Sequence, residues 1–120
     1  MDAIDRILDL VALSERLKRE LRHSWLADGR QESVAEHTWQ MAFLALLVHR
    51  RLTAPVDLLR LLKMILVHDL VEAIAGDVPF FETGARKTGK AAREAAAIEE
   101  IRSRIGGPEG EELHELWHAF

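Results

Sequence analysis

Apolar residues recur at three- and four-residue steps along most of the chain, which is the spacing typical of amphipathic helices. Ala, Leu, Glu and Arg are frequent and Tyr is absent, so local propensity also favours helix over strand. We therefore predict one all-α domain over residues 1–120, a bundle of about five helices. The expected helices span about residues 3–21, 33–52, 56–75, 91–105 and 109–120.

Local signals define the ends of several of these helices. Ser33, followed three residues later by Glu36, fits a capping box and predicts where the second helix begins. Pro55 ends that helix, because proline lacks an N–H and disfavours helical geometry in the residue before it. Gly76 suits the end of the third helix in left-handed geometry, and a loop over residues 76–90 follows it.

The segment over residues 56–75 is apolar nearly all the way round, so we expect a buried central helix there. His68, Asp69 and Glu72 interrupt it, and burying these polar groups is costly unless each finds a partner. A divalent metal ion is one such partner, and in a chain without Cys it must be held by imidazole and carboxylate groups. His37, on the preceding helix, is the third candidate ligand.

Helical geometry permits this grouping without requiring it. His68 and Glu72 are four residues apart and share a helix face, whereas His68 and Asp69 point about 100° apart. Each residue also has an ordinary structural explanation. Asp69 could pair with Lys63 or Arg60, a lone helical His is often a satisfied core residue, and capping alone explains the nearby glutamate of the second helix.

Charge and composition exclude several functional classes. The chain has 16 Lys and Arg against 20 Asp and Glu, a net charge of −4, which argues against a nucleic-acid footprint or an anionic membrane surface. The N-terminus has acids where a secretory signal has basic residues, and the longest apolar stretch contains too many charges to span a membrane. We therefore expect a cytoplasmic protein with neither nucleic-acid nor membrane partners.

Two segments resemble a known family. Residues 32–38, Glu-Ser-Val-Ala-Glu-His-Thr, resemble the Glu-Ser-Val-x-Glu-His-Ser of the HD-domain metal-dependent phosphohydrolases, in particular of their 5′-deoxynucleotidase branch. Residues 66–77, from Leu-Val-His-Asp to Ala-Gly-Asp, resemble the central helix of that branch. The resemblance implies an HD-domain-like bundle and a phosphomonoesterase of nucleotide metabolism, which splits deoxynucleoside 5′-monophosphates into deoxynucleoside and phosphate.

The resemblance also implies a role for each matching residue. His37, His68 and Asp69 match metal ligands, and the ion is Mn or Co, with Fe, Ni and Zn as further candidates. Glu72 matches the carboxylate that positions a water molecule or moves its proton beside the ion. Arg22 matches a residue that orients phosphate during catalysis.

The remaining matches concern the substrate. Trp25 matches a residue that packs on the nucleotide, and Asp77 matches a contact to the deoxyribose. The ordinary alternatives are a surface cation for Arg22 and a core aromatic for Trp25. Three further residues follow in the substrate-contacting turn: Val78, Pro79 and Phe80. Four histidines match nothing in the family: His23, His49, His114 and His118.

One departure from the family pattern keeps other functions open. The family closes its metal site with a further Asp on a later helix, but no Asp follows Asp77 in this chain. The apolar pattern of the last segment runs to Phe120 without a cap, so we expect a truncated domain that lacks the later helices of the family. A non-catalytic HD-like domain that binds a nucleotide or a partner is the alternative function, and an unrelated helical interaction module is the third.

The last segment also predicts association. Leu113, Leu116 and Trp117 form an apolar face that an incomplete bundle would leave in need of a partner. The resemblance to a family of dimers points the same way. We therefore expect a homodimer.

Overall fold

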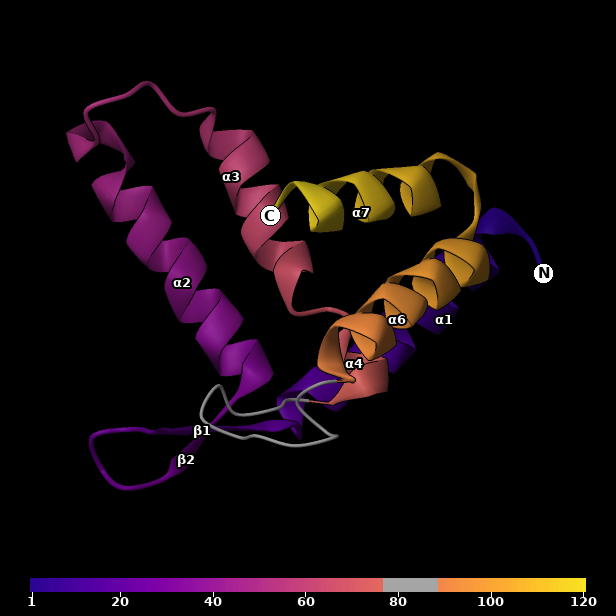
Figure 1. Ribbon diagram of the computed structural model, residues 1–120, viewed down its shortest axis with the longest axis horizontal. Coiled ribbons are helices and arrows are strands. Elements are labelled where there is room, and N and C mark those ends of the chain that lie inside the picture. Colours follow the sequence, from indigo (N-terminus) through magenta and orange to yellow (C-terminus); the bar gives the residue numbers. More distant parts are fainter. Residues whose placement is uncertain (77–88) are drawn as a thin grey trace.

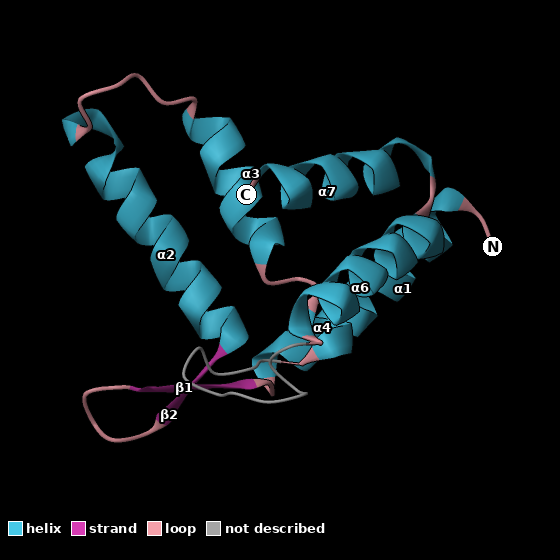
Figure 2. Ribbon diagram, in the orientation of Figure 1, coloured by secondary structure: helices cyan, strands magenta, loops and turns pink. Residues whose placement is uncertain are grey.

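Helices form most of the regular structure in the computed structural model, which describes residues 1–76 and 89–120 (Figures 1 and 2). The elements, in chain order, are α1 (Ala3–Ser14), the 3₁₀ helix η1 (Glu15–Lys18), β1 (Leu21–Trp25), β2 (Gln31–Ser33), α2 (Val34–Val48), the 3₁₀ helix η2 (His49–Arg51), α3 (Leu58–His68), α4 (Glu72–Ala75), α6 (Lys90–Ile105) and α7 (Gly107–Ala119). The predicted helical bundle is confirmed. Most of the predicted loop over residues 76–90 lies outside the described residues.

A small antiparallel hairpin interrupts the helical pattern. The first helix was expected to reach residue 21, but α1 ends at Ser14 and η1 leads into β1, which pairs with β2. Burial alternates along β1, as expected for a strand with one covered face. The turn between the strands contains Gly29 at φ +89°, a backbone conformation that favours glycine. The predicted extent of the first helix was wrong, because apolar residues beyond α1 continue the helical spacing into β1.

The capping box at the start of α2 is confirmed. The Glu36 N–H donates to Ser33 Oγ at 3.2 Å, and the Ser33 N–H donates to Glu36 Oε1 at 2.9 Å. These two bonds satisfy backbone donors that would otherwise lack partners at the helix end. The structure therefore fixes where α2 begins, and with it the position of every side chain in its first turn.

The single helix predicted over residues 56–75 was wrong, because it is divided in two. α3 ends at His68, Asp69 to Val71 form a turn, and α4 begins at Glu72. The turn lets the two helices pack on different neighbours: α3 contacts α2 and α7, whereas α4 contacts α6 and η1. At the end of α4, Gly76 has the expected positive φ of +80°, but its ψ of 166° is not that of a left-handed helix.

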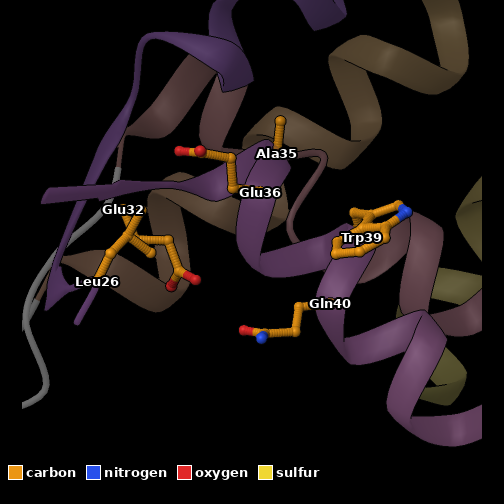
Figure 3. Close-up of a pocket in the computed structure, with 6 residues that line it drawn as sticks. All are labelled: Leu26, Glu32, Ala35, Glu36, Trp39 and Gln40. Carbon is orange, nitrogen blue, oxygen red and sulfur yellow. The ribbon is translucent and has the colours of Figure 1, made fainter. Parts of the chain in front are cut away.

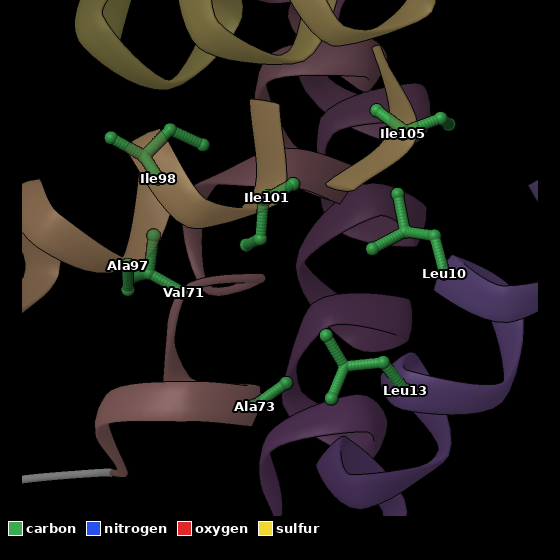
Figure 4. Packing of buried hydrophobic residues seen from close by; sticks show 8 residues of the cluster. All are labelled: Leu10, Leu13, Val71, Ala73, Ala97, Ile98, Ile101 and Ile105. Carbon is green, nitrogen blue, oxygen red and sulfur yellow. The ribbon is translucent and has the colours of Figure 1, made fainter. Parts of the chain in front are cut away.

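The hydrophobic core lies among α1, the turn before α4, α4 itself and α6 (Figure 4). Its members are Leu10, Leu13, Val71, Ala73, Ala97, Ile98, Ile101 and Ile105. The prediction that the third helix forms the centre of the core was wrong, since Leu59 and Leu66 of α3 are 65% and 70% exposed.

The apolar face of α7 was also expected to need a partner, and this expectation was wrong. Leu116 is buried, and Leu113 and Trp117 pack against the core. The exposed apolar surface lies instead on α2, where Trp39 is 67% and Leu47 61% exposed. Figure 1 shows why: α2 stands apart from the pair formed by α1 and α6. Among the described helices, none is both long enough and apolar enough to cross a membrane.

Candidate metal centre

Three potential metal ligands converge where α2 meets the end of α3. His37 lies in the first turn of α2, His68 is the last residue of α3, and Asp69 is the residue that follows it. One ligand atom from each lies within 4.8 Å of the others. Asp69 Oδ2 is 3.0 Å from His68 Nε2 and 3.7 Å from His37 Nε2.

Local structure explains how these side chains meet. The capping box at Ser33 sets the start of α2 and so places His37 at the end that faces α3. Asp69 leaves helical geometry with φ −101° and ψ 5°. Its carboxylate thereby reaches the His68 imidazole beside it, which a regular helix would hold about 100° away. The break in the helix therefore makes the cluster possible.

Two further contacts orient the His68 ring. His68 Nδ1 is hydrogen-bonded to the Ile65 carbonyl, an arrangement in which Nδ1–H donates and Nε2 faces the cluster. The Phe120 ring stacks on the imidazole, with 4.6 Å between ring centroids and 21° between the planes. The ring is thus held on one edge by a backbone acceptor and on one face by an aromatic side chain.

The electrostatics of the cluster favour metal ligation by His37 and Asp69, whereas a proton competes with a metal at His68. Burial, helped by the positive charge of Arg22, lowers the pKa of His37 and keeps that imidazole neutral. Burial alone would lower the pKa of His68, but its bond to Asp69 and to the Ile65 carbonyl raises it above its ordinary value. Burial opposes ionisation of Asp69, yet the two histidines and Arg22 hold the pKa of its carboxyl below the usual range.

The donor set fits a divalent transition metal. Two imidazole nitrogens and one carboxylate oxygen are ligands that Mn, Fe, Co, Ni and Zn all accept. Their spacing lets one ion contact all three. The alternative pairings of Asp69 with Lys63 or Arg60 were wrong, since these cations bind Glu112 at 2.8 Å and Glu115 at 2.5 Å respectively.

Arg22 lies beside the cluster and is held by Glu32 across the hairpin. Arg22 Nη1 donates to Glu32 Oε1 at 2.6 Å, and the carboxylate is only 10% exposed. The interpretation of Arg22 as an ordinary surface cation was therefore wrong. Glu32 also lines a depression of about 360 Å³ between the hairpin and α2, shown in Figure 3 with Trp39 and Gln40 on its other side. This pair was not predicted from the sequence, because no strands, and so no cross-strand partners, were expected.

Glu72 is not among the residues that group with the three ligands. Glu72 is buried, and it lines a separate cavity of about 360 Å³ with Arg16 and Arg19. The lining of that cavity includes none of the three ligands. The helical face that Glu72 was expected to share with His68 does not exist, because α3 ends before it.

The predicted substrate contacts are described only in part. Trp25 is 61% exposed, so the alternative that it is a core aromatic was wrong. The other predicted contacts lie outside the described residues: Asp77, Val78, Pro79 and Phe80.

The structure is a mainly helical domain with a candidate metal site. The site consists of a His-Asp pair at the end of one helix and a histidine from a neighbouring helix. The family model for the HD domain matches residues 14–120, and the chain belongs to this family.

Several known proteins are similar to this chain. The 5′-deoxynucleotidase HDDC2 of Dictyostelium discoideum is 29% identical over 120 residues, which cover 94% of this chain and 63% of the relative. HDDC2 of Homo sapiens is 32% identical over 117 residues, which cover 95% of this chain and 55% of the relative. A predicted metal-dependent phosphohydrolase from Magnetospirillum magnetotacticum superposes with a TM-score of 0.85 at 29% identity, covering 96% of this chain and 57% of that one. The chain thus spans little more than half the length of most of these proteins.

Proposed function

We propose that this domain is the metal-binding part of a phosphomonoesterase that hydrolyses deoxynucleoside 5′-monophosphates to deoxynucleoside and phosphate. The observation that carries the proposal is the convergence of His37, His68 and Asp69 beside the cationic Arg22. The names of the HDDC2 relatives support the same reaction. A phosphate ester is a suitable substrate, because its negative charge is complementary to a metal ion and a guanidinium.

His37, His68 and Asp69 would hold one divalent ion, Mn or Co in the first place, with Fe, Ni and Zn as further candidates. When bound, such an ion supplies Lewis acidity toward a phosphoryl oxygen and lowers the pKa of water. Asp69 would balance part of the added charge. The Ile65 carbonyl holds His68 Nδ1 and leaves Nε2 available as a ligand atom.

Arg22 would neutralise the charge that develops on the phosphoryl oxygens, and the Glu32 carboxylate keeps its guanidinium in position. Trp25, which is exposed on β1, offers a flat apolar surface for the nucleobase. Glu72 would position the attacking water or move its proton. Asp77 would contact the deoxyribose, and Val78, Pro79 and Phe80 would follow it in the substrate-contacting turn.

We also propose that the domain works as a homodimer. A groove of about 550 Å³ between α1, α2 and α3 exposes Val11, Trp39 and Leu66, each by at least 60%. Apolar surface of this kind is stabilised when another apolar surface covers it. Sedimentation should show a dimer at micromolar concentration, and Leu66→Lys should shift it toward monomer. A monomer at all concentrations would contradict this proposal.

Phosphate release tests the activity. The chain, and any longer protein that contains it, should be incubated with Mn or Co and each deoxynucleoside 5′-monophosphate, with the ribonucleotides for comparison. We expect phosphate from the deoxynucleotides, less from the ribonucleotides, and about 10²–10⁴-fold less turnover in Glu72→Ala. His49→Gln serves as a control, because His49 lies at the opposite end of α2.

The alternative is a domain that binds a nucleotide or a partner without catalysis. It needs no ligand beyond the three that converge in this chain: His37, His68 and Asp69. Nucleotide binding without phosphate release, with every divalent metal, would support this alternative. The cytoplasmic location expected from the sequence stays a prediction.

A further inference from the structure

A second cluster of metal-ligating side chains lies between α6 and α7, and the proposed function does not use its residues. His114 and His118 are one helical turn apart on α7, and Glu99 faces them from α6. His114 Nε2 is 2.6 Å from Glu99 Oε1, and the two imidazole rings are 4.5 Å apart between centroids. One ligand atom from each of the three residues lies within 4.8 Å of the others.

The scaffold under this cluster is closely packed. A Cβ added to Gly110 of α7 would come within 2.7 Å of the Arg102 carbonyl oxygen of α6, so the two helices touch backbone to backbone there. Arg102 donates to both carboxylate oxygens of Glu111, at 2.9 and 2.8 Å, and ties the helices together at the same point. The three ligands therefore extend from elements whose relative position is fixed.

The residue types determine what the cluster can hold. Two imidazoles and one carboxylate form a ligand set that Zn²⁺ uses in proteins, with a further position left for water. Arg102 Nη1 also lies 3.7 Å from Glu99 Oε2, so an ion must compete with this guanidinium. The competition is weak, because the shorter contacts of Arg102 are to Glu111.

The sequence around the two histidines, His-Glu-Leu-Trp-His over residues 114–118, has the spacing of a zinc-protease helix, in which the glutamate acts as general base. In this structure Glu115 is engaged elsewhere. Both of its oxygens accept from Arg60 of α3, at 2.5 and 3.3 Å. Since the carboxylate points toward α3, it does not reach a water molecule held by the histidines. The geometry is that of a binding site and not of a peptidase.

We propose that Glu99, His114 and His118 form a second divalent-metal site, selective for Zn²⁺ and chemically similar ions, that cross-links α6 to α7. Glu99 and His118 are exposed and His114 is half-buried, so the site is open to ions from solvent. This site is independent of His37, His68 and Asp69, and it does not depend on the proposed phosphatase activity. Its effect would be structural, because bound metal stabilises the folded state that holds it.

Calorimetric titration of metal-free protein with Zn²⁺ tests the proposal. The His68→Ala variant removes a ligand of the first cluster, so we expect one equivalent of Zn²⁺ to remain bound in it. Adding His118→Ala or Glu99→Gln to His68→Ala should weaken the remaining Zn²⁺ binding by at least about tenfold. Glu100→Gln is the matched control, because it makes the same change at the next, equally exposed position of α6 and should leave binding unchanged.

Thermal unfolding provides a second measurement on the same variants. Zn²⁺ should raise the unfolding midpoint of His68→Ala and of its Glu100→Gln double variant, but not of its Glu99→Gln double variant. Three results would overturn the proposal: no Zn²⁺ bound by His68→Ala, binding that survives both His118→Ala and Glu99→Gln, or equal losses in Glu99→Gln and Glu100→Gln. In the first case, the contact between His114 and Glu99 is only a hydrogen bond between helices.

Discussion

Replacing Glu32 with Gln removes the charge that holds Arg22 in place while keeping an oxygen that can accept its hydrogen bond. Arg22 Nη1 lies 2.6 Å from Glu32 Oε1. The Arg22 side chain is 29% exposed and the Glu32 side chain is 10% exposed. Fully buried ion pairs cost about 3–5 kcal/mol when one partner is removed, whereas exposed pairs are worth about 0–1 kcal/mol. This half-buried pair lies between these limits, so we expect Glu32→Gln to lower the free energy of unfolding by about 1–3 kcal/mol.

Urea unfolding of the purified chain measures this effect. With a urea slope of about 2 kcal/mol per molar, a loss of about 2 kcal/mol lowers the midpoint by about 1 M. Glu15→Gln is the matched control, because its partner Arg19 is 3.2 Å away but both side chains are at least 60% exposed. The control should change the free energy of unfolding by less than about 0.5 kcal/mol. If the two variants lose the same stability, burial does not strengthen the Arg22 contact and the reasoning is refuted.

Three further predictions concern stability and pH. Ser33→Ala removes the cap of α2 and should cost about 0.5–2 kcal/mol in urea unfolding, and an unchanged midpoint would contradict the role of the capping box. Ile101→Ala, at a fully buried position of the core, should cost about 2–5 kcal/mol, against under about 0.5 kcal/mol at exposed Ala96→Ser. The pKa of His68 is raised above 6.5, and a metal binds only the neutral ring. The metal affinity of the first cluster should therefore fall about tenfold per pH unit as the pH drops through that pKa. A metal affinity that stays constant down to pH 6 would contradict this prediction.

The sequence predicted those parts of the fold that local signals determine. The capping box at Ser33 marked the start of α2, and the apolar pattern placed the end of the fourth helix at residue 105, where α6 ends. The hairpin was missed although its strands are close in sequence, because the apolar residues beyond α1 continue the helical spacing into β1. The break at Asp69 was missed for a related reason: α4 packs against α6 and η1, and this tertiary contact outweighs the helical pattern of residues 56–75.

The sequence also predicted one part of the candidate site and missed another. His37, His68 and Asp69 could be grouped because their residue types and motif spacing resemble a family pattern, and the structure does bring them together. The contact between Arg22 and Glu32 depends on pairing across the hairpin, which the sequence analysis did not foresee. The division of the predicted helix between His68 and Glu72 depends on where α3 ends.

The most direct test of the central proposal is to locate the bound ion. Substoichiometric Mn²⁺ added to ¹⁵N-labelled protein broadens the amide signals nearest to the ion, so a spectrum identifies the site residue by residue. We predict that the signals of His37, His68, Asp69 and Arg22 disappear first, and that Asp69→Asn abolishes this selectivity. Broadening that centres elsewhere in the fold, or that is unchanged in Asp69→Asn, would contradict the assignment of the metal centre and the phosphatase proposal that depends on it.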